Sequence, residues 1–112
     1  MKNAVIVFSR NGMGHAPVEL QSKLAKKFLR LTIESGNLPG KILFYTEGVK
    51  LACSGSEALE ELQELEAKGV ELVLCLTCLD FFRLTDQVKV GVVGGMGDIL
   101  TAIQMADHVI SV

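Results

Sequence analysis

Cys75 and Cys78, separated by two residues, are the side chains of this sequence best suited to chemistry. If Thr77 caps a short helix, Cys78 takes the first helical position, where free backbone N–H groups and the helix dipole favour a thiolate. Such a position lowers a thiol pKa below its free value of about 8.5 and makes the sulfur a nucleophile. Asp80, one turn away, opposes ionisation because it adds a second negative charge. The alternative is that Cys78 is a small buried filler.

The same pair is typical of two other kinds of site, a thiol-disulfide redox pair and part of a zinc site. Zinc is only weakly indicated, because a second C-x-x-C or a paired-histidine segment is missing and only Cys53, His15 and His108 remain as ligands. We expect both histidines to be structural or exposed. Cys75 ends a strand-like run, so we expect it to point into packing, although a Cys75–Cys78 dithiol stays an alternative.

The glycine-rich segments carry no nucleotide-binding signature. Gly12 and Gly14 lack the third glycine of a dinucleotide fingerprint, and there is no Gly-Lys-Ser/Thr phosphate loop. Residues 94–97 precede a helix, so their N–H groups could bind an anion, but a tight turn is the simpler expectation. No metal or organic cofactor is therefore expected.

Strands that alternate with helices are expected to position the cysteines. Short apolar runs predict five strands, at residues 4–8, 41–46, 70–76, 88–93 and 108–112. Helices are expected from Pro17 to Gly36, from Ser54 to Gly69, from Thr77 through Phe82, and over 98–105. This order predicts an α/β fold, a three-layer α/β/α domain over residues 1–112 with a mostly parallel sheet of about five strands. Sites in such sheets form at the carboxyl ends of the strands, and all three cysteines lie there or nearby.

Spacing also predicts which helix faces are buried. In the first helix, apolar residues recur at intervals of four, four and three, a stripe formed by Leu20, Leu24, Phe28 and Leu31. In the second, Ser54 to Glu57 fits a capping box, and the buried stripe is Leu59, Leu62 and Leu65. The remaining side of this helix is acidic and is expected to be solvated; it carries Glu57, Glu60, Glu61, Glu64 and Glu66.

Composition narrows the class of protein. The 112 residues are 49% hydrophobic and 21% charged, which favours a folded core. A net charge of −2 indicates neither nucleic acid nor an anionic membrane as a partner, and no apolar run reaches the roughly 20 residues of a membrane span. No signal peptide is recognised, and three cysteines suit a reducing compartment, so a cytoplasmic location is expected.

Motifs along most of the chain resemble the DsrE/DsrF-like sulfur-relay family, most closely the DsrE-like domain of the YedF group of sulfurtransferase-like selenium metabolism proteins. That group has a Cys-Gly-Thr-Cys-Leu stretch, matched here by residues 75–79, followed by Lys-Val-Gly, matched by 89–91. Upstream, residues 20–28 match its Leu-Gly-x-x-Leu-x-x-x-Phe helix, and residues 48–51 match its Gly-Val-Lys-Leu segment. Leu76 and Gln21 replace glycines of the pattern, and Gly95 precedes Met96 where the group has an Asn-Met pair.

The resemblance implies a sulfur or selenium relay. Cys78, with Cys75 second, would accept sulfane sulfur as a persulfide and pass it to an acceptor, so the protein would act as a sulfurtransferase without a cofactor. It also implies a TusA-like sulfur-carrier protein, or another donor or acceptor protein, as partner, and a homo-oligomer. Two alternatives stay open: a non-enzymatic module that binds a ligand or a partner, and a Cys75–Cys78 thiol-disulfide oxidoreductase.

Overall fold

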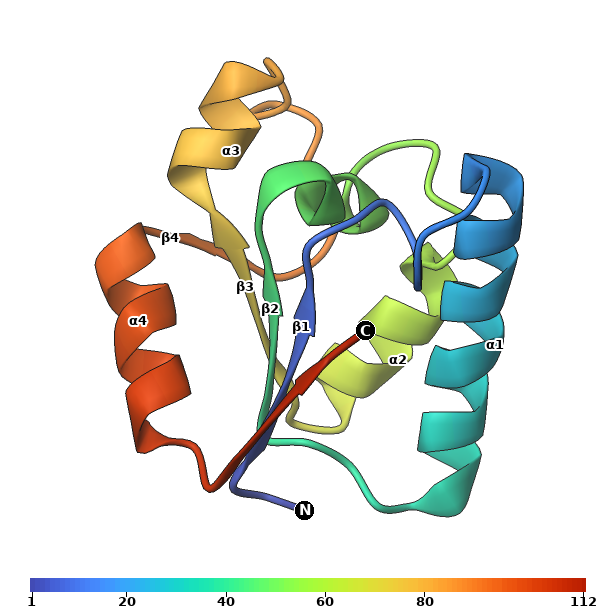
Figure 1. The fold of residues 1–112 in the computed structure, drawn as a ribbon, viewed down its shortest axis with the longest axis vertical. Helices are drawn as coiled ribbons and strands as arrows, with labels where there is room; N and C mark the ends of the chain where they lie inside the picture. The colour runs from blue at the N-terminus through green and yellow to red at the C-terminus, as the bar shows by residue number, and fades with distance from the viewer.

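Five parallel strands form the centre of the molecule (Figure 1). The computed structural model describes all 112 residues. The strands are β1 (Ala4–Phe8), β2 (Lys41–Phe44), β3 (Glu71–Cys75), β4 (Val92–Gly94) and β5 (His108–Ser111), in the order β4-β3-β2-β1-β5. Every pair of neighbours is parallel, so the carboxyl ends of all five strands lie at one edge of the sheet.

Helices cover both faces of this sheet (Figure 1). On one face lie α1 (Val18–Ser35) and α2 (Leu59–Ala67), and on the other lies α4 (Met96–Met105). The short helix α3 (Leu76–Phe81) and the 3₁₀ helix η1 (Thr46–Ala52) follow β3 and β2 directly, and both therefore lie at the carboxyl edge. The predicted three-layer α/β/α fold is confirmed. None of the helices combines the length and the apolar character of a membrane span.

The core is one cluster of 25 buried residues built around β1, β2 and β3. β1 is buried at all five positions, as its unbroken apolar run predicts for a strand covered on both faces. Phe8 and Phe44 are paired across β1 and β2 and stack with their ring centroids 5.8 Å apart. Phe28 of α1 meets Phe8 edge-on at 6.5 Å, so this aromatic cluster joins α1 to the sheet.

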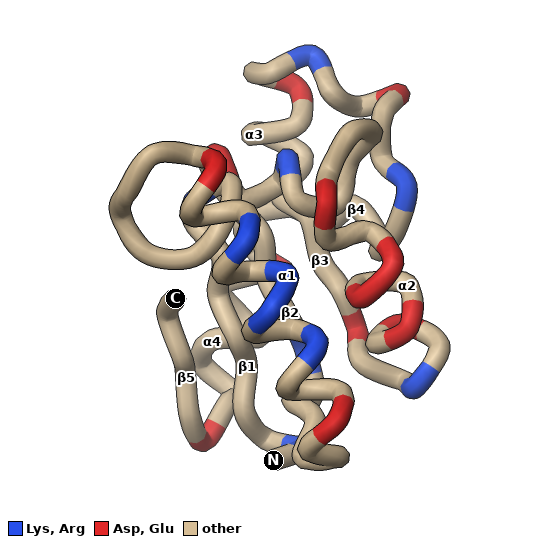
Figure 2. Tube along the Cα trace, turned by 90° about the vertical axis from the view of Figure 1, so that its right-hand side faces the viewer, with Lys and Arg blue, Asp and Glu red and all other residues tan.

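Three of the four residues of the predicted buried stripe of α1 are wrong, and the fourth, Phe28, packs against the core as expected. Leu20, Leu24 and Leu31 are exposed, whereas the buried residues of the helix are Gln21, Ala25 and Leu29. One residue corresponds to about 100° of helix rotation. This rotation brings the cations next to the buried residues, Lys26 and Arg30, toward α2, where Figure 2 shows the basic side of α1 beside the acidic side of α2.

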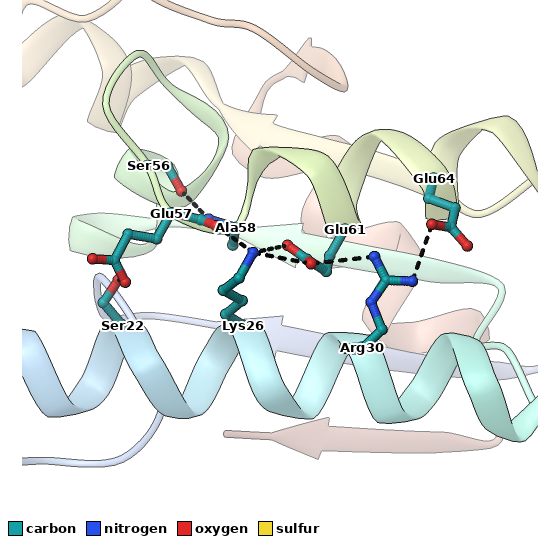
Figure 3. A network of polar contacts seen from close by, with 8 residues as sticks. All are labelled: Ser22, Lys26, Arg30, Ser56, Glu57, Ala58, Glu61 and Glu64. Atoms are coloured by element: carbon teal, nitrogen blue, oxygen red, sulfur yellow. Dashed lines mark hydrogen bonds and ion pairs between the residues drawn. The ribbon is translucent and has the colours of Figure 1, made fainter.

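Part of the acidic side of α2 is an interface and not a solvated face. Glu61 is only 3% exposed and accepts hydrogen bonds from Lys26 Nζ at 3.0 Å and Arg30 at 3.2 Å, and Arg30 also reaches Glu64 at 3.1 Å (Figure 3). These bonds satisfy a carboxylate whose burial alone would be costly. The expectation that all five glutamates face solvent is therefore wrong for Glu61.

The predicted capping box at the start of α2 is also absent. The helix begins at Leu59 after Ala58, and the hydroxyl oxygen of Ser56 accepts the N–H of Ala58 at 3.1 Å. Glu57 turns toward α1 instead, where its carboxylate accepts a hydrogen bond from Ser22 at 3.3 Å (Figure 3). The helix begins only after Glu57, so this carboxylate lies outside the first turn and the local motif does not form.

Replacing Glu61 with glutamine is expected to lower the free energy of unfolding by about 1–2 kcal/mol at pH 7. Burial raises the pKa of Glu61, but hydrogen bonds from Lys26 and Arg30 outweigh it and hold this pKa below its usual value. A lowered pKa stabilises the fold above the unfolded-state value of about 4.3, and this contribution disappears as the pH falls through the folded value. The difference between wild type and E61Q should thus shrink in acid.

Urea titrations at neutral and acidic pH measure this effect. The matched control is Glu60→Gln, since Glu60 is an exposed neighbour on the same helix and should change stability by no more than about 0.5 kcal/mol. Equal stabilities of the E61Q and E60Q proteins at pH 7 would contradict the prediction.

Candidate functional site

Cys75 and Cys78 lie at the carboxyl edge of the sheet, on either side of the start of α3. Cys75 is the last residue of β3 and is only 1% exposed, as predicted. Cys78 is half-buried and lies on the first turn of α3. The helix begins one residue before the predicted cap: Cys75 has extended backbone angles and acts as N-cap, and Leu76 and Thr77 are already helical. Cys78 is therefore the third helical residue and not the first.

The hydrogen bond to the Cys78 sulfur comes from a different element. The N–H of Thr46, the first residue of η1, donates to Cys78 Sγ at 3.0 Å. Thr46 has a φ of 48°, a left-handed conformation that is unusual for a β-branched residue. Its hydroxyl donates to the carbonyl of Ser9, just after β1, which holds it in that conformation. Thr46 thus links the segments that follow β1, β2 and β3.

The pKa of Cys78 is raised above that of an ordinary thiol, so the expectation of a lowered pKa is wrong. Burial is the largest cause, the thiol of Cys75 raises it further, and only the hydrogen bond from Thr46 lowers it. The exposed Asp80, expected to oppose ionisation, is not among the groups that determine this pKa. One amide hydrogen does not compensate for half-burial beside a second thiol.

η1 is held against the sheet by a glycine that has no room for a side chain. A Cβ on Gly48 would lie 1.9 Å from the carbonyl oxygen of Phe8, the last residue of β1. This close approach places Thr46, two residues earlier, over Cys78. Farther along η1, Lys50 pairs with Glu47 at 2.6 Å and lies 4.6 Å from the centre of the Phe82 ring, which ties η1 to the end of α3.

The other candidate residues do not join this site. Cys53 is buried at the far end of η1, its thiol donates to the carbonyl of Val49, and burial raises its pKa. His15 and His108 are exposed, and the structure gathers no group of three or more side chains that could hold a metal ion. Residues 94–97 form a capped turn in which the N–H of Gly95 donates to Asp98 at 2.9 Å.

A polar hollow at the same edge of the sheet lies away from Cys78. Its volume is about 380 Å³, and its lining includes Asn11, Ser22, Lys50, Ser54 and Glu57 but neither Cys75 nor Cys78. Charges of both signs line it, so it has no clear preference for an anion or a cation.

The contribution of Thr46 is absent from the sequence-based prediction. Its role comes from the backbone N–H and not from a diagnostic side chain, and the contact spans 32 residues of sequence. The available signal is indirect: Gly48, next to a polar residue at a strand end, marks a segment that can approach another backbone closely.

Nearly the whole chain matches one known protein family. The DsrE/DsrF-like family profile matches residues 3–112, nearly the whole chain. The chain belongs to the DsrE/DsrF-like family. Curated protein sequences include no significant match. The particular closeness to the YedF group stays a prediction.

Solved structures with the same fold as this DsrE/DsrF-like chain come from bacteria and an archaeon. The YchN protein of E. coli aligns over 100% of both chains with a TM-score of 0.74 and 23% identity. MTH1491 of Methanobacterium thermoautotrophicum, a protein of unknown function, aligns over 97% of both chains with a TM-score of 0.71 and 20% identity. BT1422 of Bacteroides thetaiotaomicron, also of unknown function, aligns over 98% of this chain and 95% of its own. Its TM-score is 0.69 and its sequence identity is 15%. At these identities the likeness concerns the fold alone.

Proposed function

We propose that this DsrE/DsrF-like protein relays sulfane sulfur on Cys78. The observation that carries the proposal is a half-exposed cysteine whose sulfur receives a backbone N–H at the carboxyl edge of the sheet. The Cys78 thiolate attacks the outer sulfur of a donor persulfide, and a new S–S bond forms. The donor S–S bond breaks, and its electron pair leaves with the donor thiolate. An acceptor thiolate then takes the outer sulfur from Cys78 in the same way.

The raised pKa of Cys78 is compatible with this exchange. A thiol of higher pKa is a stronger nucleophile once ionised, although less of it is ionised at neutral pH. The N–H of Thr46 stabilises the negative charge on Sγ, both before attack and when Cys78 becomes the leaving group. We therefore expect slow reaction with simple electrophiles, and faster reaction with a partner that brings a cation or further N–H donors to the sulfur.

Exposed apolar side chains near Cys78 support a protein partner. Leu76 and Phe81, on the same short helix, are exposed, and 81% of the surface of Phe81 is accessible to solvent. Such side chains are enriched where proteins associate. We propose a TusA-like sulfur carrier, or another sulfur donor or acceptor protein, as the partner, with selenium as an alternative cargo and the cytoplasm as the location.

Unpaired apolar surface elsewhere supports self-association. Met96, Leu100 and Met105 of α4 and Val109 of the edge strand β5 are exposed. We propose that the protein forms a homo-oligomer through apolar surface of this kind, which is separate from the contact to a sulfur carrier.

A second candidate, a binding module without sulfur transfer, is favoured by the raised pKa of Cys78 and by the polar hollow that excludes it. In that case the hollow is the functional site and Cys78 is inert. The two candidates differ in one property, the capacity of Cys78 to gain sulfur.

Intact mass spectrometry after exposure to glutathione persulfide tests the proposal. Wild type and Cys53→Ser are expected to gain the mass of one sulfur atom, which peptide mapping places on Cys78, and Cys78→Ser is expected to gain none. The C53S protein is a matched control because it also lacks one cysteine. No gain on a wild-type protein that also stays in the free-thiol form, or an equal gain on the C78S protein, would favour the binding module.

A further inference from the structure

Cys75 has a position that the sulfur relay itself does not require. It is fully buried directly at the start of α3, whereas Cys78 is half-exposed one helical turn later. Cys75 is the N-cap and Cys78 the third residue of α3, so the two side chains lie one helical turn apart, in agreement with the effect of the Cys75 thiol on the pKa of Cys78. A donor in solution can therefore reach Cys78 but not the buried Cys75.

We propose that Cys75 is a resolving thiol that releases the sulfur carried on Cys78 as sulfide, a step that rests on the proposed function. The Cys75 thiolate attacks Cys78 Sγ, the inner sulfur of the persulfide, and a Cys75–Cys78 disulfide forms. The S–S bond to the outer sulfur breaks, and its electron pair leaves with that sulfur as HS⁻. Cys75 is oxidised and the outer sulfur is reduced, so no further oxidant is needed. A dithiol reductant returns the protein to the free-thiol form.

The local geometry permits this reaction. Residues three apart on a helical turn have Cβ atoms about 5–6 Å apart, and a disulfide requires about 3.5–4.5 Å. Closing this gap requires a small movement at the start of α3, a helix of only six residues without a side-chain cap. Cys75 has extended backbone angles, so its Cβ is not fixed by helical geometry. Cys53 does not compete with Cys75 for the sulfur on Cys78, because it is buried and its thiol is hydrogen-bonded to the carbonyl of Val49.

The position of each attacking thiolate decides which of the two sulfurs of the Cys78 persulfide it attacks. The outer sulfur is exposed to solvent and to the acceptor, so an acceptor thiolate takes it from outside. Attack from inside meets Sγ first and expels the outer sulfur. The protein therefore has two outcomes after loading, transfer when an acceptor is bound and sulfide release when none is.

Two measurements on the full chain test this step. In the first, wild type, Cys75→Ser and Cys53→Ser are loaded with glutathione persulfide, freed of excess reagent, and followed by intact mass and a sulfide assay. Wild type and C53S are expected to lose the added sulfur as one sulfide per chain and to finish two hydrogens lighter than the starting thiol form. The C75S protein is expected to keep the persulfide, and Cys75→Ala, which buries no hydroxyl, is expected to behave the same way.

The second measurement does not depend on sulfur loading. Diamide, a two-electron thiol oxidant, is expected to produce a Cys75–Cys78 disulfide in wild type, identified by peptide mapping. Absence of this disulfide overturns the inference whether or not the protein loads sulfur. Loading of wild type and C75S followed by sulfur loss at equal rates also overturns it and leaves the relay in place. Absence of loading on the C75S protein, with formation of the disulfide in wild type, overturns the relay and the release step together, and identifies a dithiol redox pair.

Discussion

Replacing Gly48 with alanine is expected to destabilise the protein by about 3 kcal/mol or more, since a buried overlap with backbone cannot be relieved by a side-chain rotation. The new Cβ would lie 1.9 Å from the carbonyl oxygen of Phe8 and 2.7 Å from its carbon. Either β1 or η1 must move away from the other. Movement of η1 withdraws the N–H of Thr46 from Cys78, so the variant should also lose the polar contact at the site.

Urea denaturation with alkylation of Cys78 measures both effects. The matched control is Gly97→Ala: Gly97 is an exposed residue of α4, a Cβ added there would meet no atom within 4 Å, and its φ is not left-handed. That change should leave stability within about 0.5 kcal/mol of wild type or raise it slightly, since alanine is the better helix former. If G48A and G97A have equal stabilities, η1 does not depend on this close approach.

Replacing Cys75 with alanine is expected to lower the pKa of Cys78 and to accelerate its alkylation at neutral pH. In the wild type, burial raises the pKa of Cys78 most, and the Cys75 thiol raises it further against the lowering effect of the Thr46 N–H. The C75A variant removes the effect of the Cys75 thiol and leaves burial and the Thr46 N–H in place. Below its pKa, a thiol has about ten times more thiolate for each unit by which the pKa falls. The rate at pH 7 should therefore rise, though by less than about tenfold per unit, since the thiolate of lower pKa is less nucleophilic.

The rate of modification of Cys78 by iodoacetamide across pH, read from peptide masses, measures this change. The wild-type profile should have its midpoint above that of the urea-unfolded protein, and the C75A profile should lie at lower pH than the wild-type profile. Cys53→Ala is the matched control because it removes another buried thiol, one whose environment is separate from Cys78, and it should leave the midpoint in place. A C75A profile identical to wild type would show that the two thiols do not interact.

The order of elements and the layers of the fold are predictable from the sequence because most strands are compact apolar runs between polar or glycine-rich turns. The fourth strand is the exception: we expect it over residues 88–93, but it begins only at Val92, after Gly91 with its φ of 85°. Side-chain faces are less predictable. Spacing alone favours Leu20, Leu24 and Leu31 as part of the buried side of α1. The observed rotation buries Ala25 and Leu29 instead, and it pairs α1 with Glu61, 31 to 35 residues away. Spacing does not encode such long-range packing. Glu61 is buried for the same reason, and no local pattern distinguishes it from the exposed Glu60.

The candidate site is predictable in its residues but not in its electrostatics. The position of Cys75 and Cys78 at a strand end follows from the length of the apolar run. Whether Cys78 is ionised depends on how deeply α3 sits against η1, and burial and the second thiol together dominate that balance. A position near a helix start, taken alone, therefore predicts the wrong sign for this pKa shift.

The contact from Thr46 to Cys78 uses only main-chain atoms on one side, which affects how related proteins should be compared. Many amino acids can supply that N–H, with glycine and asparagine best suited to the left-handed φ, so an alignment column at this position can vary while the interaction persists. Proline is the exception, because it has no N–H and its ring fixes φ near −65°, far from the 48° observed. In relatives with a cysteine at the position of Cys78, the absence of proline at the position of Thr46 is therefore more informative than the presence of any one shared residue there.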